Sequence, residues 1–267
     1  MEMTMINWAN IEREQSNFKN RTPTKWAFIE EFLDNDFYGE LYNTYPKFDD
    51  TWYIQKAEKE VSKSKPDSEE AGEVGRLSYR KFWKRGDRLF FTDGTAREHV
   101  LIQENDSRYS KSWNEFMNIL WSQEFSKKLS EITGIDELNL KHMNFMYARK
   151  NGFQNTHIHN ASSKTVIVFV YFSKNWSKGD PGGTFLSDGM DFDAEGKQSG
   201  NSKIIFEPHN LDNTSLIVLD GPYAAHGMRK ITKDVERRGI QLTYESFDTV
   251  KGWYGDQNKS FFEPIDI

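Results

Sequence analysis

The spacing of hydrophobic residues changes near residue 139, and this change divides the chain into a helical part and a strand-rich part. In the first part, Phe37, Leu41 and Tyr45 recur at intervals of four and form one apolar face, which is typical of a helix. Asp34 or Asn35 stands just before this run, where a side-chain oxygen can accept a hydrogen bond from the first turn. The pattern therefore predicts a capped helix in the N-terminal part.

A second helical stretch is predicted to begin at Ser112. Ser112 and Glu115 match a capping box, in which each side chain accepts a hydrogen bond from the backbone of the other residue. Gly134 suits the left-handed position that ends many helices. The apolar stripe between these signals consists of Phe116, Ile119, Leu120, Phe125, Leu129 and Ile132. We expect this stripe to pack in the core.

Beyond residue 139 the period is that of strands. Lys164–Ser173 is β-branched or aromatic at nearly every position, which predicts a strand buried on both faces. The other candidates are Asn144–Arg149, Gly183–Ser187, Lys203–Phe206, Ser215–Leu219 and Gly239–Glu245. Short strands separated by turn residues indicate a sandwich or barrel. Helices followed by strands indicate an α+β fold with an antiparallel, mainly β core and helices packed outside.

No repeat or linker interrupts this pattern, so we expect a single domain over residues 1–267. Within it, residues 1–138 would be mostly helical, residues 139–250 would form the β-barrel core, and residues 251–267 would be a C-terminal tail. Residues 56–70 are almost wholly polar and charged. They indicate a solvated surface loop or, alternatively, a lid that substrate orders.

Composition narrows the class of protein. Hydrophobic residues make up 36% of the chain and aromatic residues 15%, which favours a packed globular protein. The net charge of −6 gives no general attraction to nucleic acid or to an anionic membrane. No apolar run is long enough to span a bilayer, and the N-terminus lacks the pattern of a signal peptide. We therefore expect a cytoplasmic protein.

Three histidines and one arginine carry the chemistry of the sequence. His157 and His159 are two residues apart, which places both on one face of an extended strand. Imidazole is the commonest protein ligand of transition metals, and the chain has no cysteine to compete for one. His226 can close a three-ligand cap if the fold returns beside the pair, and a buried Arg237 would suit a dicarboxylate co-substrate. This constellation predicts an iron site that binds 2-oxoglutarate.

The other histidines, His99, His142 and His209, lack such a context and are expected to be structural or exposed.

The chain resembles the Fe(II)/2-oxoglutarate-dependent oxygenases of the prolyl-4-hydroxylase-like branch. This resemblance implies a double-stranded β-helix, the jelly-roll barrel that cupins share. It covers most of the chain and is weakest between about residues 50 and 110. The segments that carry it are AFIEEFLDNDFYGELYNTYP, LSEITGIDEL, VIVFVYFSKNWSKGDPGGTFL, NTSLIVLDGPYAAHGM and ERRGIQLTY.

The resemblance also implies a site. The HxD motif of the family falls on His157-Ile158-His159 and its distal histidine on His226, so that His157, His159 and His226 would be the metal ligands and catalytic residues. The 2-oxoglutarate arginine falls on Arg237, with Arg238 as the close alternative.

Three further residues are expected to help bind the co-substrate. Tyr147 stands where some members place a tyrosine hydroxyl on 2-oxoglutarate. Strand alternation puts Gln241 and Thr243 on the face of Arg237, which would be the barrel interior.

The implied activity is that of a dioxygenase, specifically a hydroxylase, that uses Fe(II), 2-oxoglutarate and O2. It would oxidise an unactivated C–H bond of a peptide, amino acid, sugar or other small substrate. Neither nucleic acid nor a membrane is an expected partner.

The sequence departs from the family at His159, where a carboxylate is usual. Three histidines can still bind Fe(II), but one negative charge is lost, and Asp188 or Asp220 could supply it from elsewhere. If His159-Asn160-Ala161 is the motif instead, the chain is similar to halogenating members in which chloride takes the open position. A cupin-like metalloprotein that does not use 2-oxoglutarate and a binding protein with a vestigial site are the remaining alternatives.

Overall fold

The described helices lie in the first half of the chain, and most of the described strands lie in the second half. The computed structural model describes residues 5–47, 53–55, 78–81, 107, 109–150, 152–157, 164–189, 202–220 and 224–246. Its helices are α1 (Trp8–Arg13), α2 (Gln15–Asn20), α3 (Asn35–Asn43), α6 (Lys111–Trp121) and α7 (Gln123–Thr133). Its strands are β1 (Trp26–Glu30), β2 (Tyr53–Gln55), β3 (Ser78–Lys81), β4 (Leu138–Ala148), β5 (Gln154–His157), β6 (Thr165–Phe172), β7 (Thr184–Ser187), β8 (Ile204–Phe206), β9 (Asp212–Asp220), β10 (Ala225–Met228) and β11 (Arg237–Ser246).

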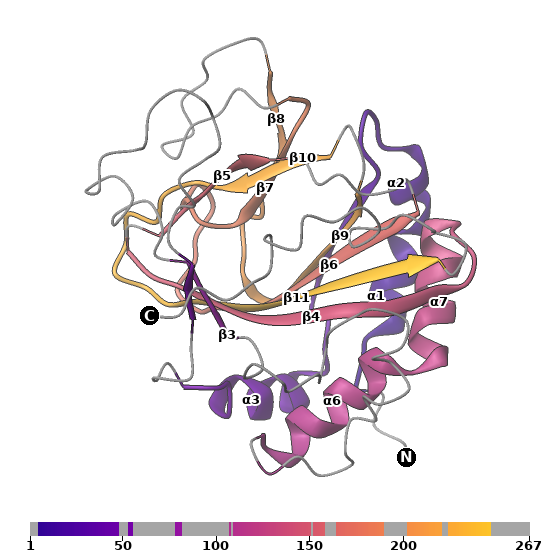
Figure 1. The fold of residues 1–267 in the computed structure, drawn as a ribbon, viewed down its shortest axis with the longest axis horizontal. Helices are drawn as coiled ribbons and strands as arrows, with labels where there is room; N and C mark the ends of the chain where they lie inside the picture. The colour runs from indigo at the N-terminus through magenta and orange to yellow at the C-terminus, as the bar shows by residue number, and fades with distance from the viewer. Residues whose placement is uncertain are drawn as a thin grey trace.

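The strands form two sheets that lie one above the other (Figure 1). The larger sheet has the order β1-β9-β6-β11-β4-β3-β2, and the smaller sheet has the order β5-β10-β7-β8. Every pairing within the described residues is antiparallel, as the sequence predicted for the β core. Strand β1 pairs with β9, so the N-terminal part contributes a strand to the larger sheet.

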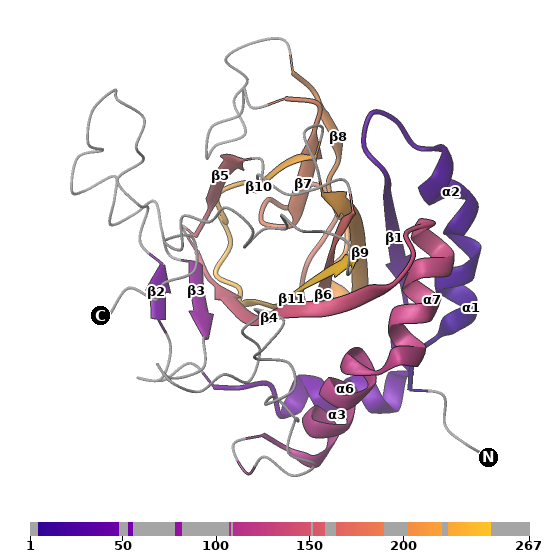
Figure 2. The same ribbon diagram turned by 45° about the vertical axis from the view of Figure 1, so that its right-hand side comes forward.

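The central strand β6 of the larger sheet is buried on both faces, and the two faces have different partners. The even-numbered residues of β6 belong to a core cluster that also contains Leu41 of α3, Trp113 of α6 and Leu129 of α7. We call this the outer face, and Figure 2 shows the helices beside it. Odd-numbered residues of β6 between 167 and 171 cluster instead with Leu186 of β7 in the smaller sheet. We call this the inner face. The predicted burial of this strand on both sides is confirmed.

Side-chain caps mark the starts of α3, α6 and α7. Asp34 caps α3 by accepting hydrogen bonds from Asp36 N at 3.0 Å and Phe37 N at 3.1 Å, as predicted. The prediction of Ser112 as a cap is wrong, because Ser110 accepts from Trp113 N and Ser112 lies inside α6. Ser122 then adopts an extended backbone and caps α7, which divides the predicted stretch into two helices. Gly134 ends α7 with a positive φ of 75°, as predicted.

The predicted strands all occur, with shifted ends, whereas β1, β2, β3, β5 and β10 were not among the strand candidates. The segment predicted from Asn144 belongs to β4, which begins six residues earlier at Leu138. Strands β5 and β10, with the sequences QNTH and AHGM, lack an apolar alternation and pair with each other. Residues 56–70 and 251–267 lie outside the described part of the chain.

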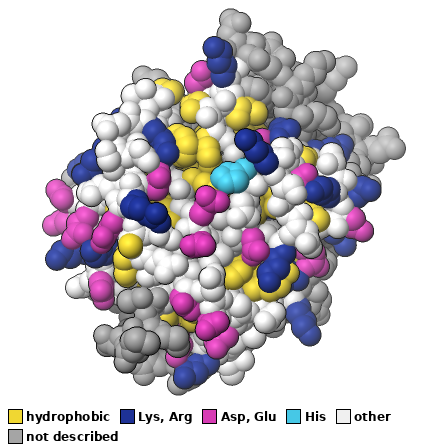
Figure 3. Space-filling view, turned by 180° about the vertical axis from the view of Figure 1, so that it is seen from behind, with side chains coloured by type: hydrophobic (Ala, Val, Ile, Leu, Met, Phe, Trp, Pro, Cys, Tyr) yellow, Lys and Arg dark blue, Asp and Glu magenta, His cyan; other side chains and the backbone are white. Residues whose placement is uncertain are grey.

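The surface carries both signs of charge. In the view of Figure 3, Lys and Arg side chains are interspersed with Asp and Glu over the described surface. Among the described helices, none combines the length and the apolar character needed to cross a bilayer.

Candidate functional site

Arg237 begins β11 and is buried at 2% exposure on the inner face. Its Nε donates to Gly182 O at 2.7 Å, and its terminal nitrogen donates to Thr184 Oγ1 at 3.1 Å. Both acceptors are neutral, and no described Asp or Glu pairs with this guanidinium. Burial lowers the pKa of Arg237, yet arginine stays charged in proteins. The inner face therefore holds a buried positive charge that no described carboxylate balances.

Tyr171 of β6 lies beside this charge. The Arg237 guanidinium carbon is 5.3 Å from the centre of the Tyr171 ring, within the range of a cation–π contact. The Tyr171 hydroxyl is buried and forms no hydrogen bond of ordinary geometry within the described residues. Burial also raises its pKa, so the hydroxyl keeps its proton and can donate it in a hydrogen bond.

Gly182 meets a backbone requirement beside Arg237. Its φ is 119°, and a Cβ there would lie 2.7 Å from side-chain atoms of Ile231 and Trp176. Only glycine adopts this backbone without strain. The Gly182 carbonyl is thereby brought to Arg237, which explains the first glycine of the Gly-Gly pair before β7.

Gln241 and Thr243 continue the inner face of β11. Gln241 pairs in register with Phe169 of β6, and Thr243 pairs with Ile167. Both are buried, at 4% and 0% exposure. The hydroxyl of Thr243 has no hydrogen-bond partner within the described residues. Strand alternation thus places these two side chains on the same face as Arg237.

His226 lies in β10 of the smaller sheet and is 3% exposed. Its Nδ1 is 2.7 Å from Ala224 O. A carbonyl oxygen only accepts, so Nδ1 carries the proton and, in the neutral ring, Nε2 carries the lone pair. Metal-ligating histidines commonly use their other ring nitrogen in this way. The His226 ring also meets Phe169 edge-on, with centroids 6.3 Å apart.

The backbones of His157 and His226 lie opposite each other in the register of β5 and β10. The side chain of His157 and the whole of His159 lie outside the described part of the structure. Among the side chains that are described, no three His, Asp or Glu residues cluster closely enough to hold a metal. Of the two alternative carboxylates, Asp188 is exposed and accepts from Lys203 N, whereas Asp220 is buried at the end of β9.

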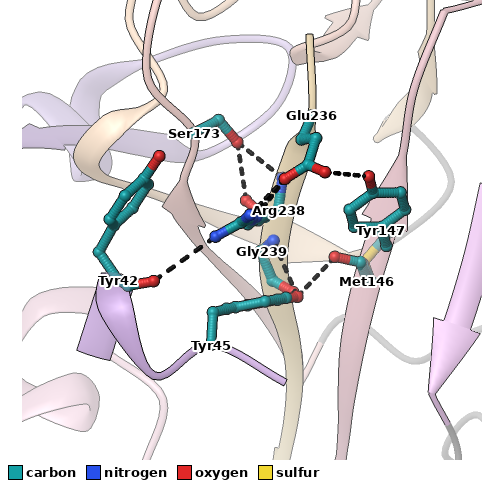
Figure 4. Close-up of polar contacts among 8 residues, drawn as sticks. All are labelled: Tyr42, Tyr45, Met146, Tyr147, Ser173, Glu236, Arg238 and Gly239. Carbon is teal, nitrogen blue, oxygen red and sulfur yellow. Dashed lines mark hydrogen bonds and ion pairs between the residues drawn. The ribbon is translucent and has the colours of Figure 1, made fainter. Parts of the chain in front are cut away.

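Tyr147 and Arg238 are not brought together with Arg237. They pair in register with each other on the outer face, where Tyr147 belongs to the helix-covered core. The Tyr147 hydroxyl donates to Glu236 Oε1 at 2.6 Å, and Arg238 Nε donates to Glu236 Oε2 at 2.9 Å (Figure 4). The structure therefore separates both residues from the inner face. Of the other histidines, His209 is exposed and contacts Glu30, whereas His99 and the side chain of His142 lie outside the description.

Tyr171 and Thr184 are site residues that the sequence analysis missed. A signal was present for Tyr171, because it is the only residue with a polar group among the inner-facing positions 167, 169 and 171 of β6. Thr184 had no comparable signal.

Comparisons with known proteins support the fold. The sequence matches no protein-family model and no curated protein. Among solved structures, the chain is similar to the non-haem α-ketoglutarate-dependent carbocyclase SnoK of nogalamycin biosynthesis, with a TM-score of 0.52 and 9% identity over 90% of this chain and 85% of that chain. It is also similar to the epimerase SnoN of the same biosynthesis, with a TM-score of 0.50 and 10% identity over 89% and 84%.

A prolyl-4-hydroxylase from Pseudomonas putida aligns with a TM-score of 0.48 and 11% identity over 88% of this chain and 98% of its own. Among the other similar structures are a 2-oxoglutarate–Fe(II) oxygenase family protein from Burkholderia pseudomallei and a prolyl hydroxylase from Trichoplax adhaerens, with TM-scores of 0.47 and 0.46.

Proposed function

We propose that this protein is a non-haem iron, 2-oxoglutarate-dependent oxygenase built on a double-stranded β-helix. The observation that carries the proposal is the buried guanidinium of Arg237, which has only neutral partners among the described residues. An unbalanced buried charge is costly, so a site that retains one is expected to bind the opposite charge. An arginine can hold a carboxylate through two parallel hydrogen bonds.

The described residues fit the distal carboxylate of 2-oxoglutarate. Arg237 would supply the positive charge, and the Tyr171 hydroxyl, which forms no hydrogen bond of ordinary geometry within the described residues, would donate to the same group. Gln241 and Thr243 lie further along the same face and would contact the remainder of the co-substrate. Tyr147 and Arg238 have no part in this proposal, because they lie on the outer face.

His226 and His157 are the proposed metal ligands, and His159 is the proposed third ligand. The tautomer of His226 and the register between β10 and β5 support this assignment. Bound Fe(II) and 2-oxoglutarate would together supply the chemistry that oxidises a C–H bond with O2. The proposed reaction is hydroxylation of a small molecule or a peptide. A cupin-like metalloprotein that does not use 2-oxoglutarate would not need the charge of Arg237, so the arginine favours the oxygenase.

The test is an anaerobic titration of Fe(II)-loaded protein with 2-oxoglutarate, monitored by the weak visible metal-to-ligand charge-transfer band. We expect a band in the wild type and its loss in Arg237→Met. Arg21→Met is a suitable control, because Arg21 is partly buried but already pairs with Glu14 at 3.0 Å. It should keep the band.

The variant His159→Asp belongs in the same titration, because it restores the usual carboxylate. A band that appears only in His159→Asp would contradict the proposal for the natural chain. A site that does not bind 2-oxoglutarate, in a cupin-like metalloprotein or a vestigial binding protein, would then be the better interpretation.

A further inference from the structure

The outer face of β11 makes mainly apolar contacts along the middle of the strand and polar contacts at its start, beside Arg237. Further along the strand, Ile240, Leu242 and Tyr244 pack in the helix-covered core. At the start of the strand, polar groups from three other elements converge on residues 236–239 (Figure 4). We call Tyr45, Tyr147, Ser173, Glu236 and Arg238 the outer network. Arg237 is the one residue of this segment whose side chain is buried on the inner face.

Tyr45, just beyond the end of α3, is the most buried phenol of the outer network, at 5% exposure. Its hydroxyl accepts from Gly239 N at 3.2 Å and lies 2.7 Å from Gly239 O and 2.6 Å from Met146 O. Gly239 and Met146 are register partners in β11 and β4. One hydroxyl therefore ties the two strands together two residues beyond Arg237.

Ser173 holds the peptide group that directly follows Arg237. Its hydroxyl accepts from Arg238 N at 2.8 Å and lies 2.9 Å from Arg238 O, to which it donates. Ser173 follows β6, so this contact fixes β11 from the side opposite to β4.

Glu236 provides the hydrogen bonds at the N-terminal end of residues 236–239. It accepts hydrogen bonds from Tyr147 and from Arg238, whose guanidinium lies 5.3 Å from the Tyr42 ring and 5.7 Å from the Tyr45 ring. Desolvation acts to raise the pKa of Glu236, but hydrogen bonds from Tyr147 and Arg238 outweigh it and lower that pKa. Glu236 is therefore an ionised acceptor at neutral pH.

We propose that Tyr45 is a positioning residue, which holds the start of β11 from the outer face so that Arg237 is fixed where a distal carboxylate binds. The inference rests on the proposed function of Arg237. Successive side chains of a strand point to opposite faces, so bonds to the backbone of residues 238 and 239 determine where the guanidinium lies. The role follows from geometry, since Tyr45 itself lies on the face away from the co-substrate.

The test compares two five-carbon 2-oxo acids that differ only in the distal carboxylate, 2-oxoglutarate and 2-oxopentanoate. Their affinities for anaerobic Fe(II)-loaded protein are measured by calorimetry in the wild type and in Tyr45→Phe. We expect 2-oxoglutarate to bind roughly three- to tenfold more weakly in the variant, the effect of one hydrogen bond. The affinity for 2-oxopentanoate should be unchanged, because it does not use Arg237.

Two matched variants separate positioning from general stability. Tyr244→Phe removes a buried hydrogen bond to Leu120 O at 2.6 Å from the same face of β11, far from Arg237. Tyr42→Phe keeps its ring beside Arg238 and removes a hydroxyl that forms no hydrogen bond within the described residues. Both should keep the wild-type ratio of the two affinities.

Wild-type affinities in Tyr45→Phe, or an equal loss for both acids, would overturn the inference. If Tyr45→Phe does not fold, Tyr147→Phe tests the same segment at its rim, where it removes the bond to Glu236. Tyr147→Phe should likewise weaken the binding of 2-oxoglutarate alone. An unchanged ratio of the two affinities in this variant would also overturn the inference. Failure of the wild type to bind 2-oxoglutarate would instead refute the proposed function itself.

Discussion

Trp26, Tyr171 and Thr243 each bury a side-chain polar atom that has no hydrogen-bond partner within the described residues. Such an atom costs a folded protein about 1–3 kcal/mol, because it loses its bonds to water and gains none. All three lie on the inner face, where Tyr171 is next to Arg237 and Thr243 lies on the same strand as Arg237. At the residue scale, the inner face, which holds the candidate site, is therefore where the described residues retain these polar groups.

This cost predicts opposite effects of one substitution on stability and on binding. Tyr171→Phe removes a buried hydroxyl that forms no hydrogen bond of ordinary geometry within the described residues, so the free energy of unfolding without ligand should rise by about 1 kcal/mol or stay unchanged. The same variant should bind 2-oxoglutarate more weakly, because the proposed donor to the carboxylate is lost. Urea unfolding and calorimetry measure the two quantities.

Tyr244→Phe provides the matched control for stability. Tyr244 is as deeply buried as Tyr171, but its hydroxyl donates to Leu120 O. Its removal should lower the free energy of unfolding by about 1–3 kcal/mol, since an acceptor is left without a partner. Equal destabilisation by both variants would mean that the Tyr171 hydroxyl contributes a bond to the folded protein, contrary to the prediction.

Sequence alternation established which residues share a face, but not which face is the inner one. A shift of one residue moves every side chain of a strand to the other face. Both faces of β11 are buried, so the usual contrast between polar and apolar sides is absent. Arg237 and Arg238 therefore remained alternatives in the sequence, and the resemblance that suggested Tyr147 did not show that Tyr147 pairs with Arg238 on the outer face. The structure distinguishes the face of Arg237 from the face of Arg238, because Ile240 and Leu242, which share a face with Arg238, pack beneath the helices.

At the scale of elements, the proposed metal ligands depend on the pairing of two short strands. Strands β5 and β10 place the backbones of His157 and His226 opposite each other. Gly227, the next residue in β10, lies so close to its neighbours that a Cβ would be 2.8 Å from Gln154 O and 2.9 Å from Phe185 Cζ. The Gln154 carbonyl belongs to the backbone, so it cannot move aside to make room for a Cβ as the end of a flexible side chain could.

We predict that Gly227→Ala separates β10 from β5. The free energy of unfolding should fall by about 1–3 kcal/mol, as for other overpacked sites. Iron affinity should fall roughly tenfold or more, because the two histidines lose their register, in line with other changes around metal ligands. Gly39→Ala is the control, since nothing lies within 4 Å of a Cβ at Gly39 in α3. It should stabilise the protein by about 0.5–1 kcal/mol and leave iron binding unchanged. Wild-type iron affinity in Gly227→Ala would contradict the assignment of this strand pair to the metal.

The elements that the sequence analysis found and those it missed differ in how they are stabilised. The long strand β6 is apolar at almost every position, so its own composition identified it. Strands β5 and β10 are four residues long and largely polar or small, and they form because β7 and each other supply hydrogen-bond partners. The break at Ser122 also depends on a local contact rather than on apolar composition. There the Ser122 side chain accepts a hydrogen bond from Phe125 N, which favours a helix start over a continuous helix.

At the scale of the whole molecule, the candidate site draws on both sheets. Arg237, Tyr171 and Gln241 come from β11 and β6 of the larger sheet. Thr184 and His226 come from β7 and β10 of the smaller sheet, and Thr184 already accepts a hydrogen bond from Arg237. The helices, in contrast, pack on the outer face. A co-substrate held between Arg237 and a metal on His226 would therefore connect the two sheets.

This arrangement predicts where ligand binding protects the backbone. Amides that exchange with solvent only through openings that break the site should slow by the factor 1 + [L]/Kd, which is about 100-fold when 2-oxoglutarate is present at 100 times its Kd. Hydrogen exchange of the iron-loaded protein, followed by mass spectrometry under anaerobic conditions, should show this slowing in β6 and the start of β11, and equally in β7 and β10. Amides that exchange by local fraying of α1 and α2 should not change, since such openings leave the site intact. Arg237→Met should remove the protection from both sheets together. Protection confined to the smaller sheet would mean that the ligand binds the metal alone, and the assignment of Arg237 to the distal carboxylate would then fail.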